Sequence, residues 1–271
     1  MRTPTVVTLP ARPDRANEDA VALGDGIAVV VDGAGLPKEL RQGCDHEVAW
    51  FSRAIADAFR DRLAAGMSLK AALAAAIEVV ADRHRDGCDL SAGSPSATVA
   101  AWRIRGGQVE HLVLCDASVV LVGPGGRTVE VTDQRIGSAV TGRVAALAGL
   151  GDGGSPTREQ RRRFGFEALE GTRNRADGWW CVHHDPAAAE HALTGTVAVD
   201  DLVRIVAASD GGTRGFKLLD AQSLGEFGRA AADPAAVAAV VRAAESARRE
   251  VSERDGTKVH DDLTLVVQEF G

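Results

Sequence analysis

Four aspartates lie far apart in the chain, each at the border of an apolar, strand-like run: Asp19, Asp32, Asp210 and Asp261. Asp32 and Asp210 each close such a run and are followed by glycine, whereas Asp261 opens one. Carboxylates at strand ends converge on one rim of a sheet, and oxygen ligands from distant segments suit a hard divalent cation. Asp-Gly is also a favoured turn dipeptide, so each motif alone predicts only a turn. Their joint occurrence predicts a metal site.

The elements that would position these residues follow an α+β order. Apolar runs predict strands at 6–9, 20–23, 27–31, 97–104, 109–114, 119–122, 128–131, 203–208 and 263–267. Helical spacing predicts a helix capped by Asp45, one from Ser68 to about Arg85, a short one at 186–193 and one at 234–250. The strands between residues 97 and 131 are predicted to form an antiparallel meander. The least regular stretch of the sequence is 133–179. Neither a dinucleotide-binding glycine motif nor a phosphate-binding loop is present.

Composition limits the class of protein. The 271 residues, 45% of them hydrophobic, suffice to bury a core as one large domain or two small ones. A net charge of −7 argues against a nucleic-acid partner. The first residues lack a long apolar segment and no run is long enough for a membrane span, so we expect no membrane partner and a cytoplasmic location. Four cysteines without a Cys-x-x-Cys pair predict reduced thiols. The oligomeric state is not predicted.

The order of the motifs resembles the metal-dependent serine/threonine protein phosphatases of type 2C, the PPM family. The resemblance covers essentially the whole chain. It rests on Arg15-Ala16-Asn17-Glu18-Asp19, Val31-Asp32-Gly33, Ser96-Ala97-Thr98, Cys115-Asp116-Ala117-Ser118, Ser209-Asp210-Gly211 and Asp261-Asp262-Leu263-Thr264. It implies one domain over 1–271, a four-layer αββα sandwich of two antiparallel sheets flanked by helices, and a variable flap at about 133–180.

The resemblance also implies a site for two Mn²⁺ or Mg²⁺ ions, with a weaker third ion in some members. Asp32 would bridge both ions, the Gly33 carbonyl would hold one, and Asp210 and Asp261 would bind the other. Glu18 and Asp19 would line the site, partly through metal-bound water molecules. Asp116 would bind the third ion, and Arg15, or next Arg12, would grip the phosphate. Two such ions about 3.5–4 Å apart lower the pKa of a water molecule for attack on phosphorus. The implied substrate is a protein phosphorylated on serine or threonine.

The sequence departs from the family at several positions. Asp262 replaces the usual asparagine, Ala34 stands where some members have a histidine, and the turn at Cys115 to Ser118 lacks its arginine. These changes indicate a divergent branch. Two alternatives to a protein phosphatase therefore stay open: a phosphatase-like regulatory module that binds a partner, and a hydrolase of a small phosphoester.

A second group of metal-ligand residue types lies outside the family pattern. Cys44 and His46 precede the first predicted helix, and His84 and Cys88 end the second. If these ends meet, the four side chains suit tetrahedral zinc, a Cys44–Cys88 disulfide or a dry core contact. Packing is the commoner role for such residues. Four further histidines, His183, His184, His191 and His260, are expected on the surface or in loops. Trp179-Trp180 is expected to anchor the irregular stretch to the core.

Overall fold

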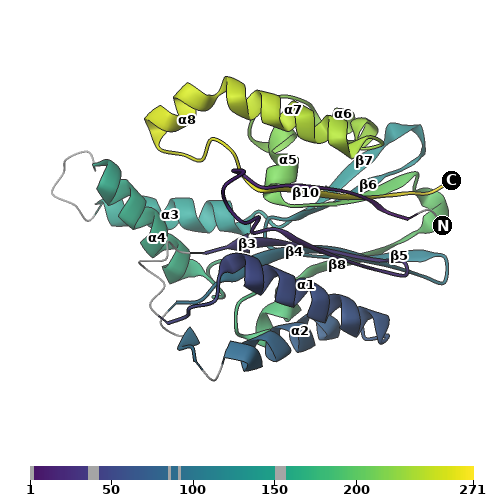
Figure 1. The fold of residues 1–271 in the computed structure, drawn as a ribbon, viewed down its shortest axis with the longest axis horizontal. Helices are drawn as coiled ribbons and strands as arrows, with labels where there is room; N and C mark the ends of the chain where they lie inside the picture. Colours follow the sequence, from purple (N-terminus) through teal and green to yellow (C-terminus); the bar gives the residue numbers. More distant parts are fainter. Residues whose placement is uncertain (1–2, 36–42, 85–86, 91–92, 150–156) are drawn as a thin grey trace.

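The fold is built from two antiparallel sheets stacked face to face, with helices on both outer surfaces (Figure 1). The computed structural model describes residues 3–35, 43–84, 87–90, 93–149 and 157–271. Within these residues one five-stranded sheet has the order β1-β10-β9-β6-β7, and the other has the order β2-β3-β4-β5-β8. All neighbouring strands pair antiparallel. This arrangement is the predicted four-layer αββα sandwich.

The strands are short and follow the apolar runs of the sequence. Their bounds are β1 Thr5–Leu9, β2 Ala20–Gly24, β3 Ile27–Ala34, β4 Ser96–Arg105, β5 Gln108–Leu114, β6 Ser118–Val122, β7 Thr128–Val131, β8 Leu193–Ala198, β9 Arg204–Ala208 and β10 Leu263–Glu269. The α-helices are α1 Val48–Ala64, α2 Leu69–His84, α3 Arg135–Gly149, α4 Arg158–Thr172, α5 Asp210–Lys217, α6 Leu224–Ala230, α7 Pro234–Ala247 and α8 Arg249–Asp255. The short 3-10 helices of the described residues are η3 Pro124–Gly126, η4 Pro186–His191 and η5 Val199–Asp201.

Three apolar layers hold the sandwich together. Between the sheets, Trp102 packs with Ile205 and Val266, all fully buried. One outer layer joins α1 and α2 to the sheet that contains β3, and the other joins α5, α6 and α7 to the sheet that contains β10. The β-branched residues of β3 and β9 suit this position because both faces of each strand are covered. No helix of the described residues is both long enough and apolar enough to cross a membrane.

The predicted meander is wrong at one connection. β5 lies in one sheet and β6 in the other, so the chain crosses between the sheets at Cys115, Asp116 and Ala117. Cys115 has a positive φ of 68°, a conformation that allows a sharp turn and that side chains other than glycine rarely adopt. Apolar patterning marks the two strands, but it does not indicate that they belong to different sheets.

Several helix predictions also need correction. Asp45 does not cap α1, because the helix begins at Val48 and its N-cap is Glu47, which makes no capping side-chain hydrogen bond. The helix predicted at 234–250 is two helices, α7 and α8. The stretch expected to be irregular contains α3 and α4, while β8, α5 and α6 were not predicted. Helix α3 has Ile136, Val140, Val144 and Leu147 at helical spacing, so the sequence does contain a signal for this helix, although only Leu147 is buried. Thr157 and Gln160 likewise form a capping box at α4 that the sequence does contain.

Candidate metal centre

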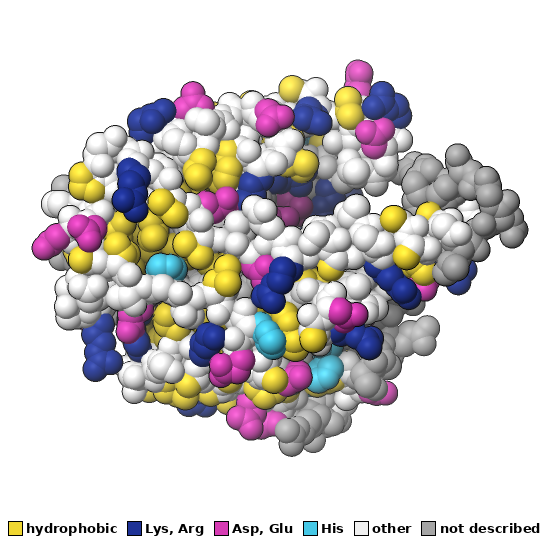
Figure 2. All heavy atoms as spheres, turned by 180° about the vertical axis from the view of Figure 1, so that it is seen from behind, with side chains coloured by type: hydrophobic (Ala, Val, Ile, Leu, Met, Phe, Trp, Pro, Cys, Tyr) yellow, Lys and Arg dark blue, Asp and Glu magenta, His cyan; other side chains and the backbone are white. Residues whose placement is uncertain are grey.

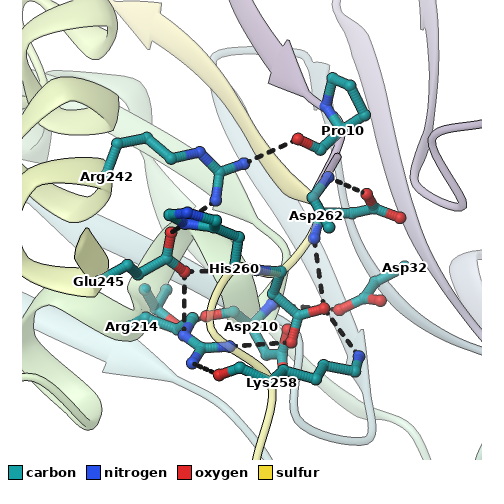
Figure 3. Close-up of polar contacts among 12 residues, drawn as sticks. Pro10, Asp32, Asp210, Arg214, Arg242, Glu245, Lys258, His260 and Asp262 are labelled. Carbon is teal, nitrogen blue, oxygen red and sulfur yellow. Dashed lines mark hydrogen bonds and ion pairs between the residues drawn. The ribbon is translucent and has the colours of Figure 1, made fainter. Parts of the chain in front are cut away.

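The predicted carboxylates come from five separate segments that meet at one end of the two sheets. Their positions are Asp19 directly before β2, Asp32 near the end of β3, Asp116 between β5 and β6, Asp210 at the start of α5, and Asp261 two residues before β10. Antiparallel pairing aligns these ends, because β2 starts where β3 ends and β9 ends where β10 starts. Figure 3 shows Asp32, Asp210 and Asp262 close together, and Figure 2 shows acidic and basic side chains gathered in a hollow of the surface.

Asp32 lies at the centre of this group. Its Oδ2 accepts a hydrogen bond of 3.2 Å from the Asp210 backbone amide, which ties the end of β3 to the start of α5. Burial raises the pKa of Asp32 well above its usual value, and the charges of Asp210, Asp19 and Asp116 raise it further. Burial likewise raises the pKa of Asp210 to about 6, with Asp261 and Asp116 adding to the effect. Several like charges in one enclosed space are unfavourable unless cations join them.

The buried carboxylate of Asp19 lies near the hydroxyl groups of Thr264 and Ser209, which lower its pKa, but it makes no hydrogen bond of normal geometry with any described residue. The residue is only 6% exposed, and neither Oδ1 nor Oδ2 has a hydrogen-bond partner among the described residues. Burial raises the pKa of Asp19 to about 7, and the neighbouring charges of Asp262 and Asp210 contribute. A buried, unpartnered carboxylate costs free energy, so its presence here indicates a place for a cation.

The glycines beside the aspartates are required by packing. A Cβ on Gly33 would overlap Ser52 Oγ at the start of α1, and a Cβ on Gly211 would overlap the carbonyl oxygen of Asp262. Glycine therefore lets α1 and α5 approach the strand ends closely enough to enclose the carboxylates. The dipeptide Asp210-Gly211 is not a simple turn, because it forms the start of helix α5, for which Ser209 is the N-cap.

Asp261 is held by cations of the chain itself. Lys258 Nζ lies 2.7 Å from its Oδ1, and Arg214 Nη1 lies 3.0 Å from its Oδ2. Arg254, the next cation before Lys258 in the chain, pairs with Asp255 instead. Arg214 was not predicted, because only the folding of α5 brings it to the start of β10.

Behind Arg214 lies a buried carboxylate, Glu245 of α7, whose side chain is fully enclosed. Arg214, Arg242 and His260 surround it at 3.3, 2.6 and 2.8 Å (Figure 3). Glu245 also accepts a hydrogen bond of 3.3 Å from the Asp261 amide. His260 is therefore paired with a buried acid and is not the solvated histidine that the sequence suggested.

Asp262 has a structural task that the sequence did not reveal. Its two carboxylate oxygens accept hydrogen bonds from the amides of Ala11 at 2.6 Å and Glu18 at 2.8 Å. The N-terminal segment is thereby fastened beside Asp19. Asparagine, with one acceptor oxygen, could accept both bonds only at that oxygen, so the aspartate at this position strengthens the attachment.

The remaining predicted site residues lie at the margin. Glu18 is exposed next to the group, and its carbonyl oxygen borders Gly33. Arg15 is exposed in the turn before Glu18, where its amide bonds to the Arg12 carbonyl at 3.1 Å. Arg12 forms an exposed ion pair with Asp14. The phosphate-binding role of Arg15 or Arg12 stays a prediction.

Asp116 lies on the crossing between the sheets. Burial raises its pKa, and the charge of Lys217 opposes that shift. The Lys217 ammonium bonds to Ser118 Oγ at 2.8 Å and pairs with Glu130 at 2.7 Å. Since α5 carries both Asp210 and Lys217, this one helix brings a carboxylate and a cation to the group.

Helices α3 and α4 extend from the end of the sandwich opposite the two termini (Figure 1). Trp179 anchors their base, as predicted, because it is buried against Cys115 and Cys181 and its Nε1 donates to Thr172 Oγ1 at 3.0 Å. Trp180 packs against the core beside α2 and stacks on His191 at 3.5 Å. His183, expected in a loop or on the surface, is buried and bonded to Ser94 Oγ at 2.6 Å. Residues 150–156 of this segment lie outside the described residues, and its role as a flap stays a prediction.

The raised pKa values lead to a pH-dependent effect of Asp19→Asn. A carboxyl group whose pKa is raised by folding destabilises the folded state as the pH rises above its ordinary pKa, and the effect is complete above the raised pKa. Without metal at pH 8, we therefore expect Asp19→Asn to be more stable than the wild type by roughly 1–3 kcal/mol. The advantage should fall toward zero as the pH drops from about 7 toward the ordinary value of 3.8.

Urea denaturation of both proteins at several pH values measures this difference. The buried histidines His84 and His183, whose pKa values burial lowers, titrate equally in both proteins and cancel. Saturating Mn²⁺ should remove the advantage of the variant, because a cation favours the ionised Asp19. A difference independent of pH would contradict the proposed cause.

Comparison with known proteins agrees with this arrangement. The family model described as Protein phosphatase 2C matches residues 12–144. No curated protein sequence matches significantly. Solved structures with the same fold include PppA of Pseudomonas aeruginosa, described as a key regulatory component of T6SS, at 18% identity and a TM-score of 0.56 over 98% of this chain and 97% of that one.

Two further structures share the fold along nearly the whole chain. The PPM Ser-Thr phosphatase MsPP from Mycobacterium smegmatis, in complex with cacodylate, has 17% identity and a TM-score of 0.56 over 99% of this chain and 98% of its own. The catalytic domain of the serine threonine protein phosphatase PstP, in complex with 2 manganese ions, has 16% identity and a TM-score of 0.53 over 98% and 96%. The family model thus matches slightly less than half of the chain, and the solved structures show that the chain has the fold of the PPM phosphatases.

Proposed function

We propose that the protein is a metal-dependent phosphatase that hydrolyses phosphoserine or phosphothreonine in proteins. The observation that carries this proposal is the convergence of Asp19, Asp32, Asp116, Asp210 and Asp261 at one end of the sheets, with the Asp19 oxygens unpartnered among the described residues. A group of acids whose pKa values are raised by burial and by one another is typical of a site that is completed by cations. The PPM fold supplies the reaction class.

The donor set fits Mn²⁺ or Mg²⁺ better than zinc, because every donor is an oxygen. Asp32, whose pKa the charges of Asp210, Asp19, Asp116 and Asp261 all raise, would be the carboxylate shared by two ions. Asp261 and the Gly33 carbonyl complete the set, and Asp116 is the candidate for a third ion. When bound, such ions would lower the pKa of a water molecule and neutralise the phosphate oxygens. The structure of PstP with two manganese ions supports this use of metal.

The chain's own residues prepare the site for that chemistry. Asp262 fixes the segment that carries Glu18 and Asp19, and Arg214 orients Asp261. The Asp210 amide, bonded to Asp32 Oδ2, leaves Asp32 Oδ1 for another partner. Arg15, exposed at the edge of the group, would bind the phosphate of the substrate as a bidentate donor. Helices α3 and α4, beside the site, would contact the protein that carries the phosphate.

A phosphatase assay with purified protein tests the proposal. With Mn²⁺ we expect hydrolysis of phosphoserine and phosphothreonine peptides, and loss of turnover when EDTA is added. Turnover of p-nitrophenyl phosphate without turnover of any phosphopeptide would instead indicate a hydrolase of small phosphoesters. Absence of turnover on both substrates, in protein that is folded and has bound Mn²⁺, would contradict the enzymatic function.

A regulatory module is the second candidate, favoured by one specific observation. Both oxygens of Asp261 already face cations of the chain, Lys258 and Arg214. A module that has lost catalysis would bind Mn²⁺ weakly or at a single site. Isothermal titration separates the two functions, since the phosphatase requires at least two bound ions per chain.

Lys258→Met tests how far Lys258 competes with metal for Asp261. The Lys258 side chain is 71% exposed, so its ion pair with Asp261 is screened by water and contributes modestly. We expect the variant to lower the half-saturating Mn²⁺ concentration roughly 2–5-fold, which corresponds to about 0.4–1 kcal/mol. Arg254→Met, which removes an equally exposed cation that pairs with Asp255, is the matched control and should change nothing. Weaker Mn²⁺ binding by Lys258→Met would show that Lys258 supports the site.

A further inference from the structure

A second cluster of ligand atoms lies away from the carboxylates, between the segment before α1 and the end of α2. It consists of Cys44, His46, His84 and Cys88, whose ligand atoms all lie within 4.8 Å of one another. Cys44 and His84 are buried, and the other two are partly buried. The residues sit about forty positions apart in two pairs, so the tertiary structure, not local sequence, brings them together.

The distances within the cluster match those between ligands of one tetrahedral zinc ion. Zn–S bonds of about 2.3 Å and Zn–N bonds of about 2.0–2.1 Å at tetrahedral angles give sulfur-to-nitrogen separations of about 3.6 Å. The observed separations from Cys44 Sγ are 3.6 Å to His46 Nδ1 and 3.3 Å to His84 Nδ1. Cys88 Sγ lies 3.4 Å from His46 Nδ1. Two thiolates and two imidazoles form one of the common structural zinc sets.

The surroundings hold the four residues in place. His84 is 1% exposed, and the Cys88 amide donates to its carbonyl oxygen at 3.0 Å. The Asp89 amide donates to the Gly43 carbonyl at 2.7 Å, which joins the two ligand-bearing segments directly. Trp50 covers the cluster, with its ring 4.0 Å from that of His46 and 5.0 Å from that of His84. Such a dry, rigid surround stabilises a metal site.

The orientation of His84 also favours a ligand at Nδ1. Its polar contact, Cys44 Sγ at 3.3 Å, is made through Nδ1, so Nδ1 is the ring atom that would bind the ion. Thiols are weak hydrogen-bond partners and compensate poorly for burying an imidazole.

We propose that Cys44, His46, His84 and Cys88 bind one structural zinc ion. The soft thiolates select zinc over the Mn²⁺ or Mg²⁺ of the carboxylate site, so the two sites take different metals. The zinc ion would clamp the segment that leads into α1 against the end of α2. Since Val48 and Ser52 at the start of α1 pack against Gly33, the clamp would also hold the wall of the carboxylate site.

Metal analysis of the purified full chain tests the proposal. The protein is expressed with zinc in the medium and dialysed against metal-free buffer without chelator. We expect close to one zinc ion per chain in the wild type, and at least a tenfold lower content in Cys44→Ser/Cys88→Ser. Cys115→Ser/Cys181→Ser, a matched pair of buried cysteines outside the cluster, should retain the zinc. Asp32→Asn should retain it too, which separates this site from the proposed catalytic one.

Cobalt replacement gives a readout that does not depend on the stability of the variants. Co²⁺ added to zinc-depleted wild type should produce the visible absorption of tetrahedral cobalt and a sulfur-to-cobalt charge-transfer band, neither of which a carboxylate site produces. Folded wild type that contains no zinc and lacks these bands would overturn the proposal. So would a Cys44–Cys88 disulfide, detected as two titratable thiols instead of four in denatured, unreduced and metal-free protein.

Discussion

Asp32→Asn is expected to reduce kcat for a phosphoserine peptide by at least roughly 10²–10³-fold, the scale on which removal of one electrostatic stabiliser acts. The reduction has a direct cause, because Asp32 is the carboxylate that Asp19, Asp116, Asp210 and Asp261 surround. Asparagine keeps the shape of the side chain but cannot bring a negative charge to two ions. Turnover measured at saturating substrate over a range of Mn²⁺ concentrations checks this expectation.

The same variant should not be less stable than the wild type without metal. Burial and the neighbouring acids raise the pKa of Asp32 well above its usual value, so its ionised form destabilises the metal-free protein at neutral pH. An inactive protein of equal or higher stability would therefore separate catalysis from folding. Asp25→Asn, at the exposed turn where β3 begins, is the matched control and should keep full activity. Unchanged turnover in Asp32→Asn would remove the proposed site.

Glu245→Ala is expected to lower the free energy of unfolding by roughly 3–5 kcal/mol, the usual cost of removing one partner from a buried ion pair. Glu245 is fully enclosed and faces Arg214, Arg242 and His260. Its loss would remove a negative charge beside the Arg214 guanidinium. Because the Arg214 side chain is only 11% exposed, water would not replace that interaction. Urea denaturation in the absence of metal measures the effect.

The control for this prediction lies on the next helix. Glu253 of α8 forms an exposed ion pair with Arg249, and Glu253→Ala should cost less than about 0.5 kcal/mol. Glu245→Gln, which keeps the size of the side chain but removes the charge, should fall between the two. Because the Asp261 amide donates to Glu245, both Glu245 variants should also weaken Mn²⁺ binding. A change below 1 kcal/mol for Glu245→Ala would show that the network contributes little to folding.

Much of the fold was predictable because buried faces of strands and helices require apolar residues at regular spacing. The strands β3, β9 and β10 are covered on both faces and read as continuous apolar runs. Helices α1 and α2 each bury one face, which produces the spacing of Phe51, Ile55 and Phe59. Helix α3 was missed although Ile136, Val140, Val144 and Leu147 have the same spacing, because Gly137 and Gly142 lower the helix propensity of this stretch. The crossing at Cys115 was also missed, because strand patterning is the same whichever sheet the strand joins.

The candidate site likewise contains residues that the sequence could predict and residues that it could not. Asp32, Asp210 and Asp261 could be selected from sequence, since each borders an apolar run and the first two precede a glycine. Arg214, Glu245 and the hydrogen bonds of the Asp262 carboxylate could not, because, apart from Arg242, which is three positions from Glu245, their partners lie 15 to 251 positions away along the chain. An ion pair depends on distance in space, and no local pattern records such a distance.

The layered α+β architecture, the aspartates at strand ends and the family resemblance could all be predicted from the sequence. Hydrophobic periodicity and short motifs are local properties, so they can be recognised without the fold. Three features are visible only in the folded chain: the cations that face Asp261, the buried Asp19 carboxylate without a hydrogen-bond partner among the described residues, and the cluster of Cys44, His46, His84 and Cys88. The physical reason is that charge pairing, desolvation and metal coordination act across space over a few ångströms. The chain reaches those separations only when sheets and helices pack together.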